Sequence, residues 1–163
     1  MTDVLTTEQR HRNMSHIRGQ DTKPEMLVRR GLHARGLRFR LHDKALPGRP
    51  DLVFARYSTT VFVHGCFWHA HGCLLSKLPS TRQNFWHHKL IGNAIRDKNI
   101  IARLQAEGWR VLVIWECALR GRQRLKGSDV LDRAEYFIRE EKIPLLAIAS
   151  LEAQSSQGRT AHS

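Results

Sequence analysis

Cysteine and histidine side chains that could bind a metal gather in one short segment of the chain. The candidate ligands are Cys66, His69, His71, Cys73 and, outside that segment, Cys117. Four thiolate or imidazole groups in a tetrahedral array suit Zn²⁺ and close a structural site, whereas an odd, small number of cysteines argues against a disulfide framework. The spacing predicts a zinc site but does not decide between His69 and His71. The alternative interpretation is a set of buried thiols with surface histidines.

An aspartate stands where a turn leads into a short apolar segment. Asp51 follows residues 46–50, which include two prolines and a glycine, and precedes residues 52–54, which are all apolar. A carboxylate here is a hard oxygen ligand of the kind that Mg²⁺ uses together with waters and substrate phosphate. A metal bound by Asp51 could polarise a phosphodiester. The alternative is an aspartate that makes a hydrogen bond within the turn.

Acid–base catalysis is open to any histidine that does not bind zinc. If His71 is the zinc ligand, His69 is free for proton transfer, because the ordinary pKa of an imidazole, near ~6.5, suits this role at neutral pH. His64 is a further candidate. Glu25 has a structural role of its own, since Thr22 and Glu25 form a capping box at a helix start. That role leaves room for a second one at a metal.

Two bulky aromatic residues, Phe67 and Trp68, lie between a candidate zinc ligand and a histidine. Neighbours held on a metal-binding loop cannot easily both enter one core. Apolar side chains that insert between base steps are a known means of opening a duplex. The pair is therefore a candidate DNA wedge, and packing of one of the two in the core is the alternative.

The composition favours a nucleic acid as the partner. The chain has 163 residues, enough for one domain, and a formal net charge of +12, which makes a polyanionic partner the natural expectation. No apolar run reaches the ~20 residues of a membrane span, and residues 1–8 lack the features of a secretory signal. We expect a cytoplasmic protein with a basic arm over residues 1–20, one domain over residues 21–150 and a disordered tail over residues 151–163.

Hydrophobic periodicity predicts helices and strands in an α/β order. We expect helices over residues 22–36, 81–107 and 129–141, and strands over residues 37–41, 52–54, 60–64 and 110–115. The last strand is almost wholly apolar and follows a helical crossover. It should therefore be covered on both faces and run parallel to an earlier strand. The fold class is α/β with a mixed sheet.

Several longer motifs, in the same order along the chain, resemble those of the very short patch repair (Vsr) DNA mismatch endonucleases. The resemblance covers roughly residues 8–140. Its most specific parts are Leu46-Pro47-Gly48-Arg49-Pro50-Asp51; His64-Gly65-Cys66-Phe67-Trp68-His69 with His71 and Cys73; Pro79, Thr81 and Arg82 with Phe85-Trp86; and Gly108-Trp109-Arg110-Val111-Leu112 with Trp115-Glu116-Cys117-Ala118-Leu119-Arg120-Gly121-Arg122.

The resemblance implies a restriction-endonuclease-like fold, in which helices flank a mixed central sheet, and a magnesium-dependent endonuclease. It implies a nick on the 5′ side of the thymine in a T:G mismatch, with a 5′-phosphate left on the DNA. Such mismatches arise when 5-methylcytosine deaminates. The resemblance therefore also implies work alongside a cytosine-5 methyltransferase and a repair polymerase, at the nucleoid of a bacterium. Because nicking one strand needs only one copy of the chain, we expect a monomer in the cytoplasm.

The resemblance further implies roles for individual residues. Asp51 would bind Mg²⁺ together with the main-chain carbonyl of Val63, and His69 would be the catalytic histidine, with His64 and Glu25 in support. The zinc ligands would be Cys66, His71, Cys73 and Cys117. The aromatic wedge would be Phe67 and Trp68, and Met14, on the basic arm, would enter the DNA from the other groove.

One departure from the wider pattern of such nucleases affects the expected mechanism. Their second strand usually carries an acidic residue and a lysine, where this chain has Val63 and Gly65. A histidine-assisted mechanism is therefore favoured over one with two carboxylates and a lysine. Two other functions stay open: a non-catalytic zinc module that binds distorted DNA, and a restriction nuclease that cuts matched sites.

Overall fold

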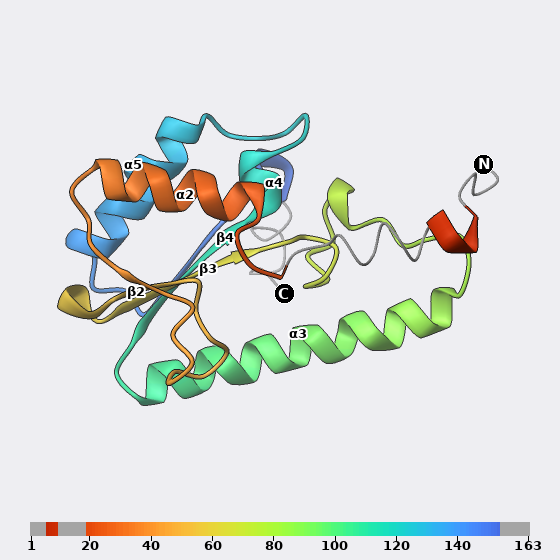
Figure 1. Ribbon diagram of the computed structural model, residues 1–163, viewed down its shortest axis with the longest axis horizontal. Coiled ribbons are helices and arrows are strands. Elements are labelled where there is room, and N and C mark those ends of the chain that lie inside the picture. The colour runs from red at the N-terminus through yellow and green to blue at the C-terminus, as the bar shows by residue number, and fades with distance from the viewer. Residues whose placement is uncertain (1–5, 10–18, 154–163) are drawn as a thin grey trace, which may run out of the picture.

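A mixed five-stranded sheet forms the centre of the protein (Figure 1). The computed structural model describes residues 6–9 and 19–153. The strands lie in chain order: β1 (Arg40–Leu41), β2 (Leu52–Phe54), β3 (Thr59–His64), β4 (Arg110–Trp115) and β5 (Leu145–Ile148). The first three strands are antiparallel to one another, and β3, β4 and β5 are parallel. The predicted mixed α/β architecture is confirmed.

Helices cover the sheet on both faces. These are α2 (Lys23–Ala34), α3 (Gln83–Ala106), α4 (Glu116–Leu119) and α5 (Gly127–Arg139), with short 3₁₀ turns η1 (Ala55–Tyr57) and η2 (Leu74–Ser76). In Figure 1, α2 and α5 lie on one face of the sheet and α3 on the other. Alternate residues of β4 therefore enter two cores: Leu112 and Ile114 pack in the one that includes α2 and α5, and Val111 and Val113 in the one that includes Leu104 of α3.

Helix α2 begins as its sequence predicts. The Thr22 hydroxyl accepts a hydrogen bond of 3.3 Å from the Glu25 N–H, and Val28 and Leu32 are fully buried. The Glu25 carboxylate accepts a hydrogen bond from the Asp21 N–H, one residue before the position that the usual capping box would give it. This cap keeps the carboxylate inside the protein, where its side chain is only 2% exposed.

Three parts of the predicted structure need correction. The strand expected over residues 37–41 is paired only at Arg40–Leu41, because Leu37 instead closes the end of α2 through its N–H bond to Leu32 and enters the core. Strand β5 and helix α4 were not predicted at all. Residues 151–153 of the predicted tail are helical, and residues 154–163 lie outside the described residues.

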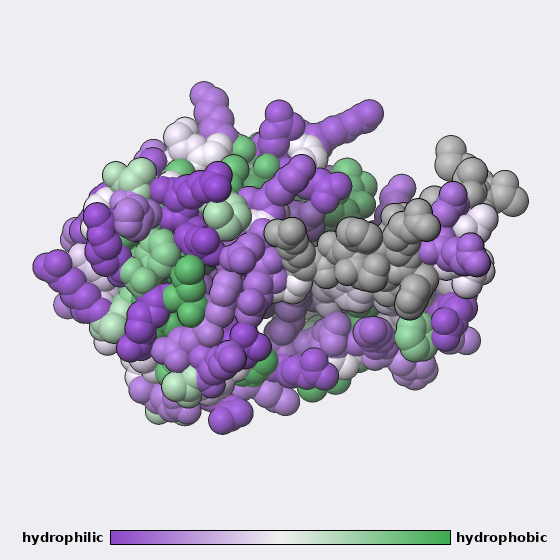
Figure 2. Space-filling view, viewed as in Figure 1, coloured by the Kyte–Doolittle hydropathy of each residue, from purple (hydrophilic) through white to green (hydrophobic). Residues whose placement is uncertain are grey.

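The face shown in Figure 2 is mostly hydrophilic, with small green hydrophobic patches between the hydrophilic residues. Helix α3 is 24 residues long, and only Leu90 and Leu104 of it are fully covered. Within the described ranges, no helix has the length and the apolar character that a membrane span requires. Much of α3 is open to solvent.

Candidate active site and metal centre

Two groups of candidate functional side chains lie at one end of the sheet, at the carboxyl ends of the parallel strands β3 and β4. His64 and Trp115, the last residues of these parallel strands, are paired in register. The segment after β3 carries the cysteines and histidines at residues 66–73, and α4 directly after β4 carries Cys117. Because parallel strands end at the same edge, residues that are 51 positions apart, Cys66 and Cys117, come into contact.

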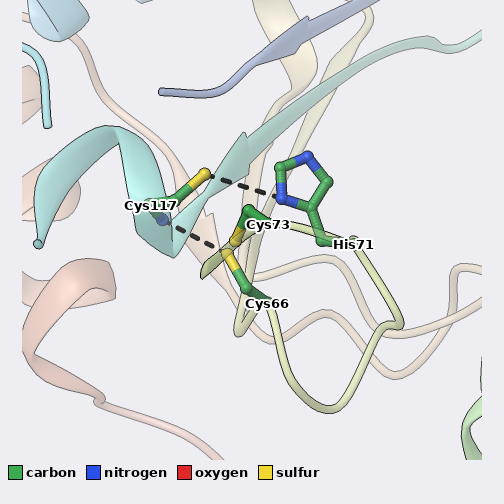
Figure 3. Close-up of side chains that lie close together, drawn as sticks. All are labelled: Cys66, His71, Cys73 and Cys117. Carbon is green, nitrogen blue, oxygen red and sulfur yellow. Dashed lines mark hydrogen bonds between the residues drawn. The ribbon is translucent and has the colours of Figure 1, made fainter. Parts of the chain in front are cut away.

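The first group is a cluster of three cysteines and one histidine. Figure 3 shows Cys66, His71, Cys73 and Cys117 converging on one point, and their possible ligand atoms all lie within 4.8 Å of one another. Two main-chain groups face the sulfurs: the Cys117 N–H donates to Cys66 Sγ, and the Ser150 N–H donates to Cys117 Sγ, both at 3.3 Å. The hydrogen bond between Cys66 and Cys117 lowers the pKa of Cys117 and, together with burial, raises the pKa of Cys66, so Cys117 is the first of the two to become a thiolate.

His69 lies outside this cluster although it is only two residues from His71. Ala70 between them has a left-handed backbone conformation, with φ of 51°, and the N–H of His71 turns back to the Cys66 carbonyl. The reversal directs the two side chains to different places. His71 Nδ1 lies 3.5 Å from Cys117 Sγ, whereas the His69 ring stacks on His64 with 3.8 Å between the ring centroids. The structure therefore separates the two histidines, between which the spacing alone did not decide.

The second group surrounds a pocket of about 280 Å³. Its lining includes His42, Asp51, Val63, His64, His69 and Asp97. Asp51 directly precedes β2, next to the Leu52–Val61 pair with β3, and its Oδ2 accepts a 2.7 Å hydrogen bond from the Val63 N–H in place of a strand partner. Burial raises the pKa of Asp51 to about 6; the Val63 N–H opposes the rise, and the Glu25 carboxylate adds to it.

Glu25 and Asp51 are joined by a histidine that the sequence did not single out. His42 Nε2 lies 2.6 Å from Glu25 Oε1 and 4.0 Å from Asp51 Oδ1. The His42 N–H also donates to the Asp51 carbonyl, and His42 has a positive φ of 45°. His42 thus connects the capping carboxylate of α2 to the pocket. Its only sequence signal is a position shortly before the turn that leads to Asp51.

The stacked pair of histidines has a carboxylate partner from α3. Asp97 Oδ2 lies 2.5 Å from His69 Nδ1. His64 is buried, its Nδ1 has no hydrogen-bond partner among the described residues, and burial, followed by the charge of His69, lowers its pKa to about 3. His64 is therefore neutral at ordinary pH. No sequence pattern marked Asp97, because it is one of several charged residues on a long helix.

Trp115 separates the two groups. One face of its ring stacks on His71, with 4.0 Å between centroids and 11° between planes. Its ring also contacts that of His64 in a T-shaped arrangement, with 5.3 Å between the centroids. The indole therefore contacts the cysteine cluster through His71 and the pocket through His64, and it fixes the spacing between them.

The aromatic pair Phe67 and Trp68 joins a larger cluster at the start of α3. Trp86 contacts both rings, with centroids 5.4 Å from Phe67 and 5.9 Å from Trp68. Lys89 Nζ lies over the Trp68 and Trp86 rings at 5.8 and 5.7 Å. All three rings are half-buried, so neither Phe67 nor Trp68 belongs to the core. The sequence indicated Trp86 only as part of a motif of the resemblance, with no role for its ring. Met14 lies outside the described residues.

Comparison with known proteins agrees with this geometry. Residues 2–75 match the family model of the DNA mismatch endonuclease Vsr. The chain is 47% identical to the DNA mismatch endonuclease Vsr of Escherichia coli over 138 residues, which cover 85% of this chain and 88% of that protein. It is 50% identical over 119 residues, 73% of this chain and 88% of the relative, to the type II nicking enzyme V.XorIIP of Xanthomonas oryzae. A third relative, V.NmeAIP of Neisseria meningitidis, is 42% identical over 87% of this chain and 98% of its own length. The chain therefore belongs to the Vsr family of DNA mismatch endonucleases.

Proposed function

We propose that this endonuclease nicks one DNA strand on the 5′ side of the thymine in T:G mismatches that arise from deamination of 5-methylcytosine. Water attacks phosphorus, the bond from phosphorus to the 3′ oxygen breaks, and a 5′-phosphate remains. The observation that carries the proposal is the pocket in which Asp51, Val63, His64 and His69 meet. Nicking by relatives named as nicking enzymes supports it.

The donor set of the pocket fits Mg²⁺. Asp51 supplies a carboxylate. A strand residue directs its N–H and its C=O to the same edge, so the Val63 carbonyl faces the side on which the Val63 N–H meets Asp51. Two hard oxygens leave room for waters and a substrate phosphate, which is the usual way of holding this ion. When bound, Mg²⁺ supplies Lewis-acid stabilisation of charge on the phosphate oxygens.

His69 is the catalytic base in this proposal. An ionised carboxylate can only accept a hydrogen bond, so Asp97 fixes the proton of His69 on Nδ1 and leaves Nε2 to accept a proton from the attacking water. His64 supports this role because its ring stacks flat on His69 and stays neutral. Glu25 acts with Asp51 through His42.

A structural zinc ion is the second metal that we propose. Cys66, His71, Cys73 and Cys117 supply three thiolates and one imidazole, a set that closes a tetrahedral site. The main-chain N–H groups aimed at two of the sulfurs are the outer contacts that such a site needs. The ion would fix the loop after β3 to α4, and with it the neighbouring His69.

DNA binding in this proposal combines charge and an aromatic wedge. The excess of basic side chains binds phosphates, and Phe67 and Trp68, supported by Trp86, open the base stack at the mismatch. Residues 1–20 form a basic arm that carries Met14 into the other groove. Residues 21–150 form the endonuclease domain on a restriction-endonuclease-like core, and residues 151–163 form a tail.

The setting that we propose follows from the substrate. An enzyme that removes products of 5-methylcytosine deamination works with a cytosine-5 methyltransferase and a repair polymerase. One active site suffices to nick one strand, so we propose a monomer. It acts in the cytoplasm, at the nucleoid.

The test is a nicking assay on T:G duplexes with varied flanking bases, beside matched duplexes, in magnesium and in EDTA. We expect a nick only at the mismatch, only with magnesium, and none with Asp51→Ala, while Asp51→Ala keeps most DNA affinity. Binding without any nicking by the wild type would instead identify a non-catalytic module for distorted DNA. Cleavage of both strands of a matched duplex would identify a restriction nuclease.

A further inference from the structure

One strong cation lines the pocket, and the proposed mechanism leaves it without a role. Arg49 is the only arginine or lysine among the described residues that line this pocket, beside the carboxylates of Asp51 and Asp97. Its side chain is exposed, and no described residue accepts a hydrogen bond from its guanidinium. By contrast, Arg29, Arg35 and Arg139 each hold a carboxylate.

The backbone holds Arg49 in this place at a conformational cost. Gly48 and Arg49 both have left-handed conformations, with φ of 74° and 48°, and for a residue with a side chain this persists only where its surroundings impose it. The turn is closed by the hydrogen bond from the Arg49 N–H to the Leu46 carbonyl. It is also pressed onto α3, since a Cβ on Gly48 would lie 2.4 Å from Ile100.

The turn therefore sets Arg49 at a fixed place relative to Asp51. Only Pro50 separates the two residues, and its ring restricts the backbone between them. Strain at a site of this kind indicates a functional constraint, and here the strained residue adds a cation to a pocket with two carboxylates. Those carboxylates repel a phosphodiester unless a positive group offsets them.

We propose that Arg49 binds the non-bridging oxygens of the phosphodiester that is cleaved in this pocket. A planar guanidinium with several donors matches phosphate oxygens in a bidentate manner, which a lysine cannot do. Arg49 thereby orients the phosphorus beside Asp51 and His69. The inference rests on the proposed nicking function, and it adds a substrate-binding residue to it.

The experiment compares wild type with Arg49→Ala and Arg49→Lys in nicking and in DNA binding. Arg56 is the matched control, because it is an exposed arginine in η1, at the opposite end of the β2–β3 pair from Asp51. We expect Arg49→Ala to lower kcat by about 10- to 100-fold, the usual effect of losing a hydrogen bond to a charged group. The kcat of Arg49→Lys should lie between those of the wild type and Arg49→Ala. Arg56→Ala should nick as the wild type does.

A binding measurement in magnesium-free buffer tests the contact itself. The duplex carries a single neutral methylphosphonate, either at the cleaved position or at one phosphate to each side. We expect the cleaved-position substitution to weaken wild-type binding about 10-fold and to have no further effect on Arg49→Ala. At the flanking positions the two losses should be additive. Equal melting temperatures of the variants would exclude a change of fold.

Additive losses at the cleaved position, or an unchanged kcat for Arg49→Ala, would overturn the proposal. If the wild type nicks no duplex at all, the proposed function fails instead. The binding cycle still decides the role of Arg49 in that case, because it requires no cleavage. The two failures are therefore distinguishable.

Discussion

The cysteine cluster and the pocket lie on either side of Trp115, yet they are built in opposite ways. The cluster gathers soft ligands, is largely buried, and has main-chain N–H groups directed at its sulfurs. The pocket gathers carboxylates and imidazoles whose burial works against their charged forms, as the shifted pKa values of Asp51 and His64 show. The difference teaches that one region is suited to hold the fold together, whereas the other keeps reactive groups at a cost to stability.

Removal of a zinc ligand should have the largest effect. We expect His71→Ala and Cys117→Ser to lose bound zinc and to destabilise the protein by more than about 4 kcal/mol, because loss of a structural metal is among the most damaging changes. Metal content by mass spectrometry and the free energy of unfolding in denaturant measure both effects. The matched control is His69→Ala, on the same loop. Normal stability of His71→Ala would show that the two regions do not differ as proposed.

Changes at His69 should separate catalysis from stability. We expect His69→Ala to keep its zinc and its melting temperature while kcat falls by about 10²- to 10⁴-fold, the usual contribution of a general base. Asp97→Asn should cost less, because the amide can still pair with the ring but no longer fixes the proton on Nδ1. Single-turnover nicking gives both values. A His69→Ala variant that loses zinc would assign this histidine to the cluster.

Asp51→Asn should stabilise the protein while it abolishes nicking. The folded state raises the pKa of Asp51 from 3.8 to about 6, so its contribution to stability is fully present below pH 3.8 and is lost as pH rises through 6. Asparagine keeps the acceptor for the Val63 N–H and carries no charge. We expect a gain of up to about 3 kcal/mol at pH 7.5 that vanishes near pH 3.5, measured in denaturant without magnesium or chelator. Equal gains at both pH values would contradict this cause.

Exchange of His42 should have the smallest effect. His42→Gln can still donate to Glu25, so we expect kcat within about threefold of the wild type, whereas His42→Ala leaves the buried carboxylate without this donor and should lower kcat by about tenfold. The magnesium concentration for half-maximal rate should rise only for His42→Ala, because misplacement of Glu25 disturbs Asp51. If both variants behave alike, the ring itself, and not its hydrogen bond, is what matters.

The sequence predicted the elements that hydrophobic pattern alone determines. Residues 110–115 form β4 as expected, since a continuous apolar run after a helix has few other places in a fold. Strand β5 escaped prediction because its four residues have no alternation, and they become a strand only by pairing with β4 at the edge of the sheet. Leu37 and Phe39 alternate like a strand but pack against other parts of the core.

The residues of the candidate site likewise fall into those that a local sequence pattern indicated and those that only the fold brings together. The chain has only three cysteines, so the candidate zinc ligands could be named from the sequence. The position of Asp51 directly before an apolar strand indicated a metal ligand at the start of that strand. The contacts of His42 with Glu25 and of Asp97 with His69 join residues 17 and 28 positions apart. No local pattern marks them, because only the crossing of helices over the sheet brings them together. The choice of His71 over His69 came from the family resemblance, and its physical basis is the backbone of Ala70.

That single left-handed residue between the two histidines has a consequence for how this loop can change over time. In the proposed function, His69 directly before Ala70 serves the chemistry, and His71 directly after it serves the metal. An insertion or deletion there would misplace both at once, whereas substitutions can adjust each separately. The loop should therefore keep a constant length in descendants of this protein while its individual residues vary. A redesign of this loop should likewise substitute side chains and keep the number of residues unchanged.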